Sequence, residues 1–78
     1  MNYNIKESGK RIKELRKAKG LTQDKLSEKI GISCQGLTMI ECGINGARID
    51  TFVYLAEALD TTIDYLVLGR SCMVIDEE

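Results

Sequence analysis

Three cysteines are the side chains in this sequence best suited to covalent or metal chemistry. They are Cys34, Cys42 and Cys72, and the 78 residues contain no histidine. An odd number of thiols without a Cys-x-x-Cys spacing fits neither a closed disulfide framework nor a zinc site. Histidine is also the commonest general base, and no nucleophile–base pair or glycine-rich phosphate loop is evident. We therefore expect reduced thiols that act as small apolar side chains, no metal, no cofactor, no small-molecule ligand and no enzymatic activity.

Charged residues are divided unevenly along the chain. Residues 1–48 contain ten Lys and Arg against five Asp and Glu, whereas residues 49–78 contain one Arg against seven acids. The first part therefore has a net charge of +5 and the second −6, although the whole chain has −1. A basic end can face a polyanion while an acidic end turns away from it. A solvated basic helix would give the same distribution, so charge alone does not decide.

The composition is that of one small helical domain. Hydrophobic residues make up 44% and charged residues 29% of the chain, and proline is absent. These values suit a globular protein with one core and a bias towards helix. No apolar run approaches the roughly 18–20 residues that span a bilayer. Because Met1-Asn2-Tyr3-Asn4 precedes no apolar segment, we also expect no signal peptide and a cytoplasmic protein.

Capping residues and glycines divide the chain into five predicted helices, joined by short loops of which 43–48 is the longest. The predicted helices are Ile5 to Ala18, a helix capped by Thr22 that ends at Ile30, a helix capped by Ser33 that stops at Cys42-Gly43, a helix from about Asp50 to Leu59, and a short helix capped by Thr61 or Thr62 and closed by Gly69. The fourth helix is expected to bury Ile49, Phe52, Leu55, Ala56 and Leu59.

We expect one all-α domain over residues 1–70 and a tail over 71–78. The tail contains the apolar run Cys72-Met73-Val74-Ile75 followed by three acids. It is either disordered or an arm that packs on a second subunit. Four exposed apolar residues in a row are unfavourable, which favours the arm.

Residues 23–42 have the pattern of two crossed helices joined by a tight turn. Ser27 is small where the helices would cross, and Gly31 suits the turn. Ile30, Leu37 and Ile40 would fill the wedge between the two helices.

Five segments carry a resemblance to a known family. They are Lys13–Gln23 (KELRKAKGLTQ), Leu26–Ser33 (LSEKIGIS), Ile40–Gly43 (IECG), Leu55–Leu59 (LAEAL) and Ile63–Leu66 (IDYL). Together they resemble the lambda-repressor-like (XRE-type) helix-turn-helix family over roughly residues 5–69. The resemblance implies a compact five-helix DNA-binding domain in which the third helix enters the major groove and the second crosses above the backbone.

On this resemblance the third helix would contact bases through Cys34, Gln35, Thr38 and Met39. Gln35 can bond adenine N6 and N7 together, which is worth about 1–3 kcal/mol of discrimination. Thr38 would donate to a base or a phosphate, and its methyl group, Met39 or Cys34 would touch a thymine methyl group. Gly36 within this helix costs about 1 kcal/mol relative to alanine; either it lets the backbone approach the groove or it is a tolerated weakness, and we favour the weakness.

The resemblance also implies contacts to DNA phosphates and one structural ion pair. The expected phosphate contacts are Gln23, Thr22 and Ser33 near helix N-termini, with Lys10, Arg11 and Arg48 as weaker candidates. Arg16 and Glu41 stand where the family ties its first helix to the end of its third. That pair would fix the recognition helix and would not touch DNA.

The chain departs from the family on the outward side of the third helix, which carries no charge, and in the loop that follows, where Ile44, Gly46 and Ala47 replace the usual basic or proline residues. These departures predict weak or salt-sensitive binding by one monomer. The resemblance implies sequence-specific binding of double-stranded DNA by a homodimer, which we expect to act as a transcriptional repressor on a roughly palindromic operator. The dimer surface is expected around Tyr65, Leu68 and Met73. An antitoxin-like or adaptor module that binds another protein remains the alternative.

Overall fold

A computed structural model describes residues 3–69 of the chain. Within that range the chain forms five helices and no strand. They are α1 (Ile5–Ala18), α2 (Gln23–Ile30), α3 (Cys34–Glu41), α4 (Ile49–Ala58) and α5 (Ile63–Leu68). The all-α class and the five helices are confirmed, and α4 begins and ends one residue earlier than predicted. The proposed tail over 71–78, including Cys72 and Met73, lies outside the described residues.

Side-chain caps fix where four of the helices begin. Thr22, Ser33 and Thr62 each accept a hydrogen bond from a backbone N–H in the first turn of the helix that follows, at 3.0–3.1 Å. Asn4 does the same for α1 and accepts from two N–H groups at 3.0 Å. This cap was not predicted. Arg48 precedes α4 and makes no side-chain cap bond.

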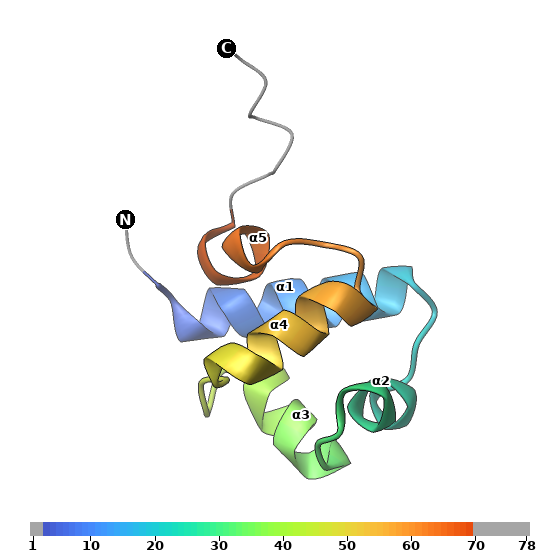
Figure 1. Ribbon diagram of the computed structural model, residues 1–78. Coiled ribbons are helices and arrows are strands. Elements are labelled where there is room, and N and C mark those ends of the chain that lie inside the picture. Colours follow the sequence, from blue (N-terminus) through green and yellow to red (C-terminus); the bar gives the residue numbers. More distant parts are fainter. Residues whose placement is uncertain (1–2, 70–78) are drawn as a thin grey trace.

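The helices enclose one core, and α1 lies between α5 on one side and α3 on the other (Figure 1). Helix α2 packs against α3 and α4, and α4 also contacts α5. The buried apolar residues come from every helix: Ile12, Leu26, Ile30, Leu37, Phe52, Leu55, Ala56, Leu59 and Leu66. The fold therefore places α3 and α5 on opposite sides of α1.

The predicted burial of Ile49 is wrong, because 66% of this residue is exposed. Ile49 is the first residue of α4 and lies at the edge of its inward face, which is centred on Phe52, Leu55 and Leu59. Val53, one turn further along, is also exposed. Helical spacing alone could not show that the side of α4 bearing Ile49 and Val53 is exposed.

A surface ion pair joins the ends of α1 and α4. Lys19 Nζ lies 2.5 Å from Asp60 Oδ2, and this hydrogen bond lowers the pKa of Asp60 below its ordinary value. Asp60 also has a positive φ of 56°, which suits the turn that follows α4. Most of the Asp60 side chain is in water, so the pair contributes little to stability.

The backbones of α1 and the end of α3 approach each other closely at two glycines. A Cβ atom added to Gly9 would lie 2.3 Å from the carbonyl oxygen of Ile40 and 2.7 Å from that of Glu41. One added to Gly43 would lie 2.8 Å from Lys6 Cα. These distances are far inside van der Waals contact, and backbone atoms cannot rotate out of the way. Glycine is therefore required for α3 to pack directly on α1.

Ser8, next to Gly9, is the one buried residue in the described part of the chain whose side-chain oxygen has no hydrogen-bond partner. It is 2% exposed. An unsatisfied buried hydroxyl costs roughly 1–3 kcal/mol. The Ser8 hydroxyl therefore lowers the stability of the folded protein.

Alanine at these two neighbouring positions is expected to have opposite effects on stability. Gly9→Ala should lower the free energy of unfolding by about 3 kcal/mol, since the clash with α3 outweighs the gain in helix propensity. Ser8→Ala should raise it by about 1 kcal/mol, because the unsatisfied hydroxyl is removed. Urea unfolding followed by circular dichroism measures both. A stabilising Gly9→Ala would contradict the close approach.

Candidate nucleic-acid interface

Helices α2 and α3 form the predicted helix-turn-helix. Gly31 adopts φ of 79° and its N–H donates to Ser27 O at 2.9 Å, as does Ile32 N–H at 3.0 Å. Ser27 is buried between the helices, and its hydroxyl donates to the backbone oxygen of Asp24 at 3.0 Å. Leu37 is buried in the wedge and Ile40 is half-buried. The turn at Gly31 and the small residue at position 27 are confirmed.

Arg16 and Glu41 form a buried, two-pronged ion pair between α1 and the last residue of α3. Arg16 Nε donates to Glu41 Oε2 at 2.7 Å, and Nη2 donates to Oε1 at 3.2 Å. The third guanidinium nitrogen, Nη1, donates to Leu21 O at 2.9 Å. Arg16 is 8% exposed and Glu41 6%. The pair fixes α3 relative to α1 and also holds the loop that leads into α2.

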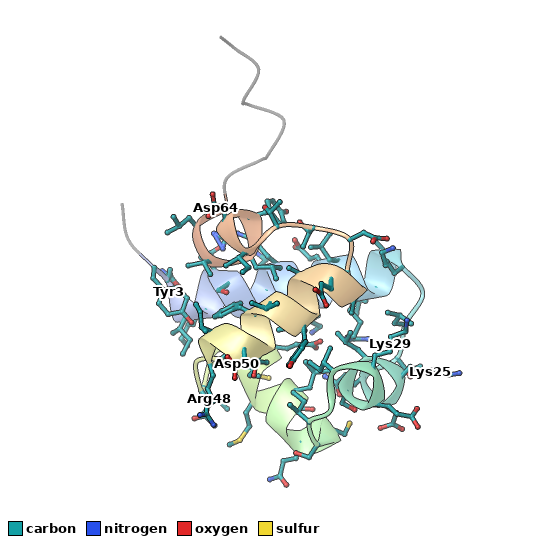
Figure 2. All side chains as sticks on the ribbon, in the orientation of Figure 1. Tyr3, Lys25, Lys29, Arg48, Asp50 and Asp64 are labelled. Atoms are coloured by element: carbon teal, nitrogen blue, oxygen red, sulfur yellow. The ribbon has the colours of Figure 1, made fainter. Side chains whose placement is uncertain are left out.

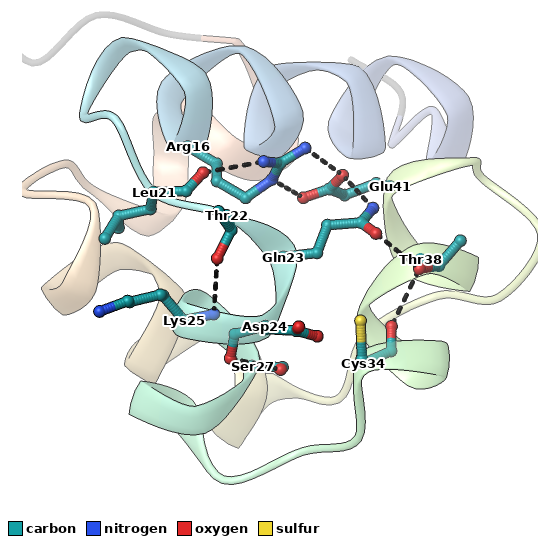
Figure 3. A network of polar contacts seen from close by, with 10 residues as sticks. All are labelled: Arg16, Leu21, Thr22, Gln23, Asp24, Lys25, Ser27, Cys34, Thr38 and Glu41. Carbon is teal, nitrogen blue, oxygen red and sulfur yellow. Dashed lines mark hydrogen bonds and ion pairs between the residues drawn. The ribbon is translucent and has the colours of Figure 1, made fainter.

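Gln23 extends this pair into a network that reaches the middle of α3 (Figure 3). Its amide nitrogen Nε2 donates to Glu41 Oε1 at 3.0 Å. Its amide oxygen Oε1 lies 3.0 Å from Thr38 Oγ, which is also 2.9 Å from the backbone oxygen of Cys34. The Gln23 side chain therefore links α2 to the middle of α3 and to its end. Sequence reasoning missed this role, because no local pattern relates residues 23, 38 and 41.

The four predicted base-contacting residues lie together on α3. Gln35 is exposed in the first turn, while Cys34, Thr38 and Met39 are half-buried. Asn45 Nδ2 lies 3.5 Å from Met39 Sδ, which connects the following loop to this surface. The pKa of the Cys34 thiol is raised, mainly because the Asp24 carboxylate accepts a hydrogen bond from the protonated thiol and secondly because of partial burial. The thiol is thus kept neutral.

Four of the six predicted phosphate contacts are exposed, and the other two, Gln23 and Arg11, are half-buried. Thr22, Ser33 and Arg48 are exposed at the N-termini of α2, α3 and α4, and Figure 2 shows Arg48 on the side of the molecule where α3 lies. Lys10 is exposed on α1.

Arg11 differs from that expectation. Its Nη1 lies 3.4 Å from Leu66 O, so the guanidinium is directed to α5, on the other side of α1 from α3. The contact to α5 accounts for the position of Arg11. None of the helices within residues 3–69 has the length and apolarity needed to cross a membrane.

Gly36 makes close contact with the residue that caps its own helix. A Cβ atom added there would lie 3.1 Å from Ser33 Oγ, the oxygen that accepts from Gly36 N–H. The glycine therefore leaves room for the cap, a local reason that was not among the two alternatives weighed from the sequence.

Comparison with known proteins decides the family. The helix-turn-helix family model matches residues 12–66. The chain belongs to the helix-turn-helix family. An uncharacterized HTH-type transcriptional regulator of Rickettsia conorii, RC0668, is 44% identical over 61 residues, which are 78% of this chain and 49% of that protein. This helix-turn-helix chain thus spans about half the length of the curated relatives it matches.

Two solved structures show the same arrangement of helices. The restriction-modification controller protein C.AhdI of Aeromonas hydrophila has a TM-score of 0.75 and 32% identity, over 80% of this chain and 94% of that one. The P22 c2 repressor, solved in complex with a synthetic operator, has a TM-score of 0.78 and 27% identity, over 81% and 96%. The lambda-repressor-like resemblance is confirmed. The expectation that the chain is not an enzyme agrees with the family and with these proteins, which are named as a transcriptional regulator, a controller protein and a repressor.

Breaking the Arg16–Glu41 pair on one side is expected to destabilise the domain strongly. Glu41→Leu should cost about 3–5 kcal/mol of unfolding free energy, because the Arg16 guanidinium stays buried without its counter-charge. Replacing both residues, Arg16→Met with Glu41→Leu, should cost less, since no charge is left buried. Urea unfolding of the double variant and of the two single variants, Arg16→Met alone included, separates the free energy of the Arg16–Glu41 interaction from the effect of removing each side chain. A double variant that loses as much as the sum of the single variants would show that the two side chains do not interact.

Proposed function

We propose that this protein binds double-stranded DNA with sequence specificity through α3 and regulates transcription as a repressor. One observation carries the proposal: a buried network holds α3 in place while Gln35, in its first turn, is exposed. A recognition helix needs both features, since bases are read only if the helix is rigid and its side chains are free. The likeness to the P22 c2 repressor, solved with a synthetic operator, supports this. A repressor of this kind would act in the cytoplasm.

Base contacts are assigned to one side of α3. Gln35 would make two hydrogen bonds to one adenine. Cys34, Met39 and the Thr38 methyl group offer apolar atoms to thymine methyl groups. This surface carries no charge between residues 34 and 39, so its contribution is specificity and not electrostatic attraction.

Phosphate contacts are assigned to three helix N-termini, where free backbone N–H groups favour anions. Thr22 and Gln23 begin α2, Ser33 begins α3, and Arg48 adds a positive charge before α4. Lys10 is a weaker candidate on α1, and Arg11 is not included because it is directed to α5. With few charges near the groove, each monomer binds weakly and salt weakens it further.

The DNA proposal is tested by selecting bound sites from random duplexes. The protein should enrich one motif, and Gln35→Ala should relax it at one adenine per half-site, a loss of about 1–3 kcal/mol there. Asp64→Asn serves as a control, since it lies on α5 away from α3 (Figure 2).

Two negative results would mean different things. An unchanged motif in Gln35→Ala would exclude Gln35 as a base contact. If no duplex were enriched at all, the adaptor alternative, in which the uncharged surface of α3 binds another protein, would replace this proposal.

We also propose that two copies bind together, because one eight-residue recognition helix gives too little surface for a useful affinity. Two copies of α3 about 34 Å apart would read a roughly palindromic operator. Two surfaces compete for the dimer contact. Tyr65 and Leu68 of α5 are half-buried, whereas Ile49 and Val53 of α4 are exposed one turn apart.

Sedimentation equilibrium distinguishes the two surfaces. The protein should dimerise at tens of micromolar, and one of Leu68→Glu and Val53→Glu should return it to monomer, because a buried unpaired charge opposes association. The other variant then serves as the matched control. A protein that stays monomeric at high micromolar concentration would exclude the dimer.

A further inference from the structure

The hydroxyl group of Thr38 has one proton, and both nearby acceptors for it lie inside the protein. Thr38 Oγ is 3.0 Å from Gln23 Oε1 and 2.9 Å from the backbone oxygen of Cys34. A hydroxyl donates one hydrogen bond and can accept two. Whichever of the two oxygens accepts the hydrogen bond, the hydroxyl proton is directed to another part of the protein, either to Gln23 on α2 or to the backbone of α3. No hydrogen bond within residues 3–69 is donated to Thr38 Oγ, so a base can donate one to it.

The direction of this proton is set by the buried ion pair. Glu41, bonded to Arg16, is ionised and can only accept hydrogen bonds. The Gln23 side chain must therefore turn its N–H₂ end to Glu41 Oε1 and its oxygen to Thr38 (Figure 3). The reverse orientation would place two oxygens against each other at Glu41. The charge of Glu41 thus determines, through Gln23, that Thr38 donates inward.

We propose that Thr38 presents only hydrogen-bond acceptors to DNA and selects a base with an exocyclic amino group, adenine or cytosine, at one position of each half-site. In the major groove adenine N6 and cytosine N4 donate, whereas guanine O6 and thymine O4 accept. The Thr38 oxygen bonds the amino bases and repels the other two. This inference rests on the proposed DNA binding by α3, and it replaces the expectation that Thr38 donates to a base or a phosphate.

The side chains next to Thr38 differ from it in the hydrogen bonds that they can offer to a base. The Asp24 carboxylate is the main cause that raises the pKa of the Cys34 thiol, so Cys34 offers no thiolate to a base. Exposed Gln35 is free to donate and accept through its amide. The Thr38 position should therefore discriminate amino from keto bases, whereas the Gln35 position should prefer adenine alone.

The experiment has two steps. Sites are first selected from random duplexes by the wild-type protein and by Thr38→Val. This substitution removes the hydroxyl but keeps the shape of the side chain. The position at which only the wild type prefers adenine or cytosine is the Thr38 position. Circular dichroism checks that Thr38→Val is folded, and Thr38→Ala locates the position if it is not.

Base analogues then test the direction of the hydrogen bond. Purine lacks the N6 amino group of adenine, and 7-deazaadenine lacks its N7 acceptor; 2-pyrimidinone replaces cytosine where cytosine is selected. Removing the amino group should weaken wild-type binding about twofold to tenfold, as one neutral hydrogen bond does. Thr38→Val should be insensitive to this change, and Thr38→Ser, which keeps the hydroxyl, should remain sensitive. Where adenine is selected, 7-deazaadenine should have no effect that depends on Thr38.

The outcomes separate this inference from the function on which it rests. If the wild type enriches no motif, the proposed function fails and the inference with it. If a motif is enriched but Thr38→Val enriches the same one, only the inference is overturned. A Thr38-dependent preference for guanine or thymine, or a Thr38-dependent loss with 7-deazaadenine, would show that Thr38 donates and would also overturn it.

Discussion

The buried pair of Arg16 and Glu41 is the interaction on which the rest of the interface depends. Two charges removed from water are tolerable only when their hydrogen-bonding groups are satisfied. Here Arg16 bonds Glu41 twice and Leu21 O once, and Glu41 accepts a further bond from Gln23. These partners belong to α1, the loop after it, α2 and α3. Satisfying the two charges therefore requires all of these segments to take one relative position.

That position is reached only because α1 has no side chain at Gly9. Gly9, Ile12 and Arg16 are three and four residues apart, so they share one face of α1. At Gly9 the α1 backbone touches the carbonyl oxygens of Ile40 and Glu41. Two turns further along the same face, Arg16 meets the Glu41 carboxylate at 2.7 Å. The missing Cβ and the ion pair are thus two parts of one contact, and the pair could not close if α3 were held further away.

The sequence predicted what depends on neighbours along the chain and missed what depends on the crossing of helices. Caps such as Thr22 and Ser33, the turn at Gly31 and the helical faces are local, and they were predicted within about one residue. The Arg16–Glu41 pair was expected from family resemblance and not from spacing. Burial of Ile49, the direction of Arg11 and the Gln23–Thr38 bond depend on distances between separate helices. Asn4 is different, since its cap is local and could have been predicted from its residue type.

The surface of α3 to which we assign base contacts carries no charge, and this limits the interactions that can give it specificity. Electrostatic attraction to phosphates is the same for every sequence, so it places a protein on DNA without choosing a site. Between residues 34 and 39 this chain has only hydrogen bonds and apolar contacts to offer. The direction of the Thr38 hydrogen bond is set behind the surface, where Gln23, oriented by Glu41, faces Thr38. If α3 binds DNA as proposed, substitutions at buried positions that never meet a base would change which base is chosen, and the buried pair would contribute to specificity as well as to the fold.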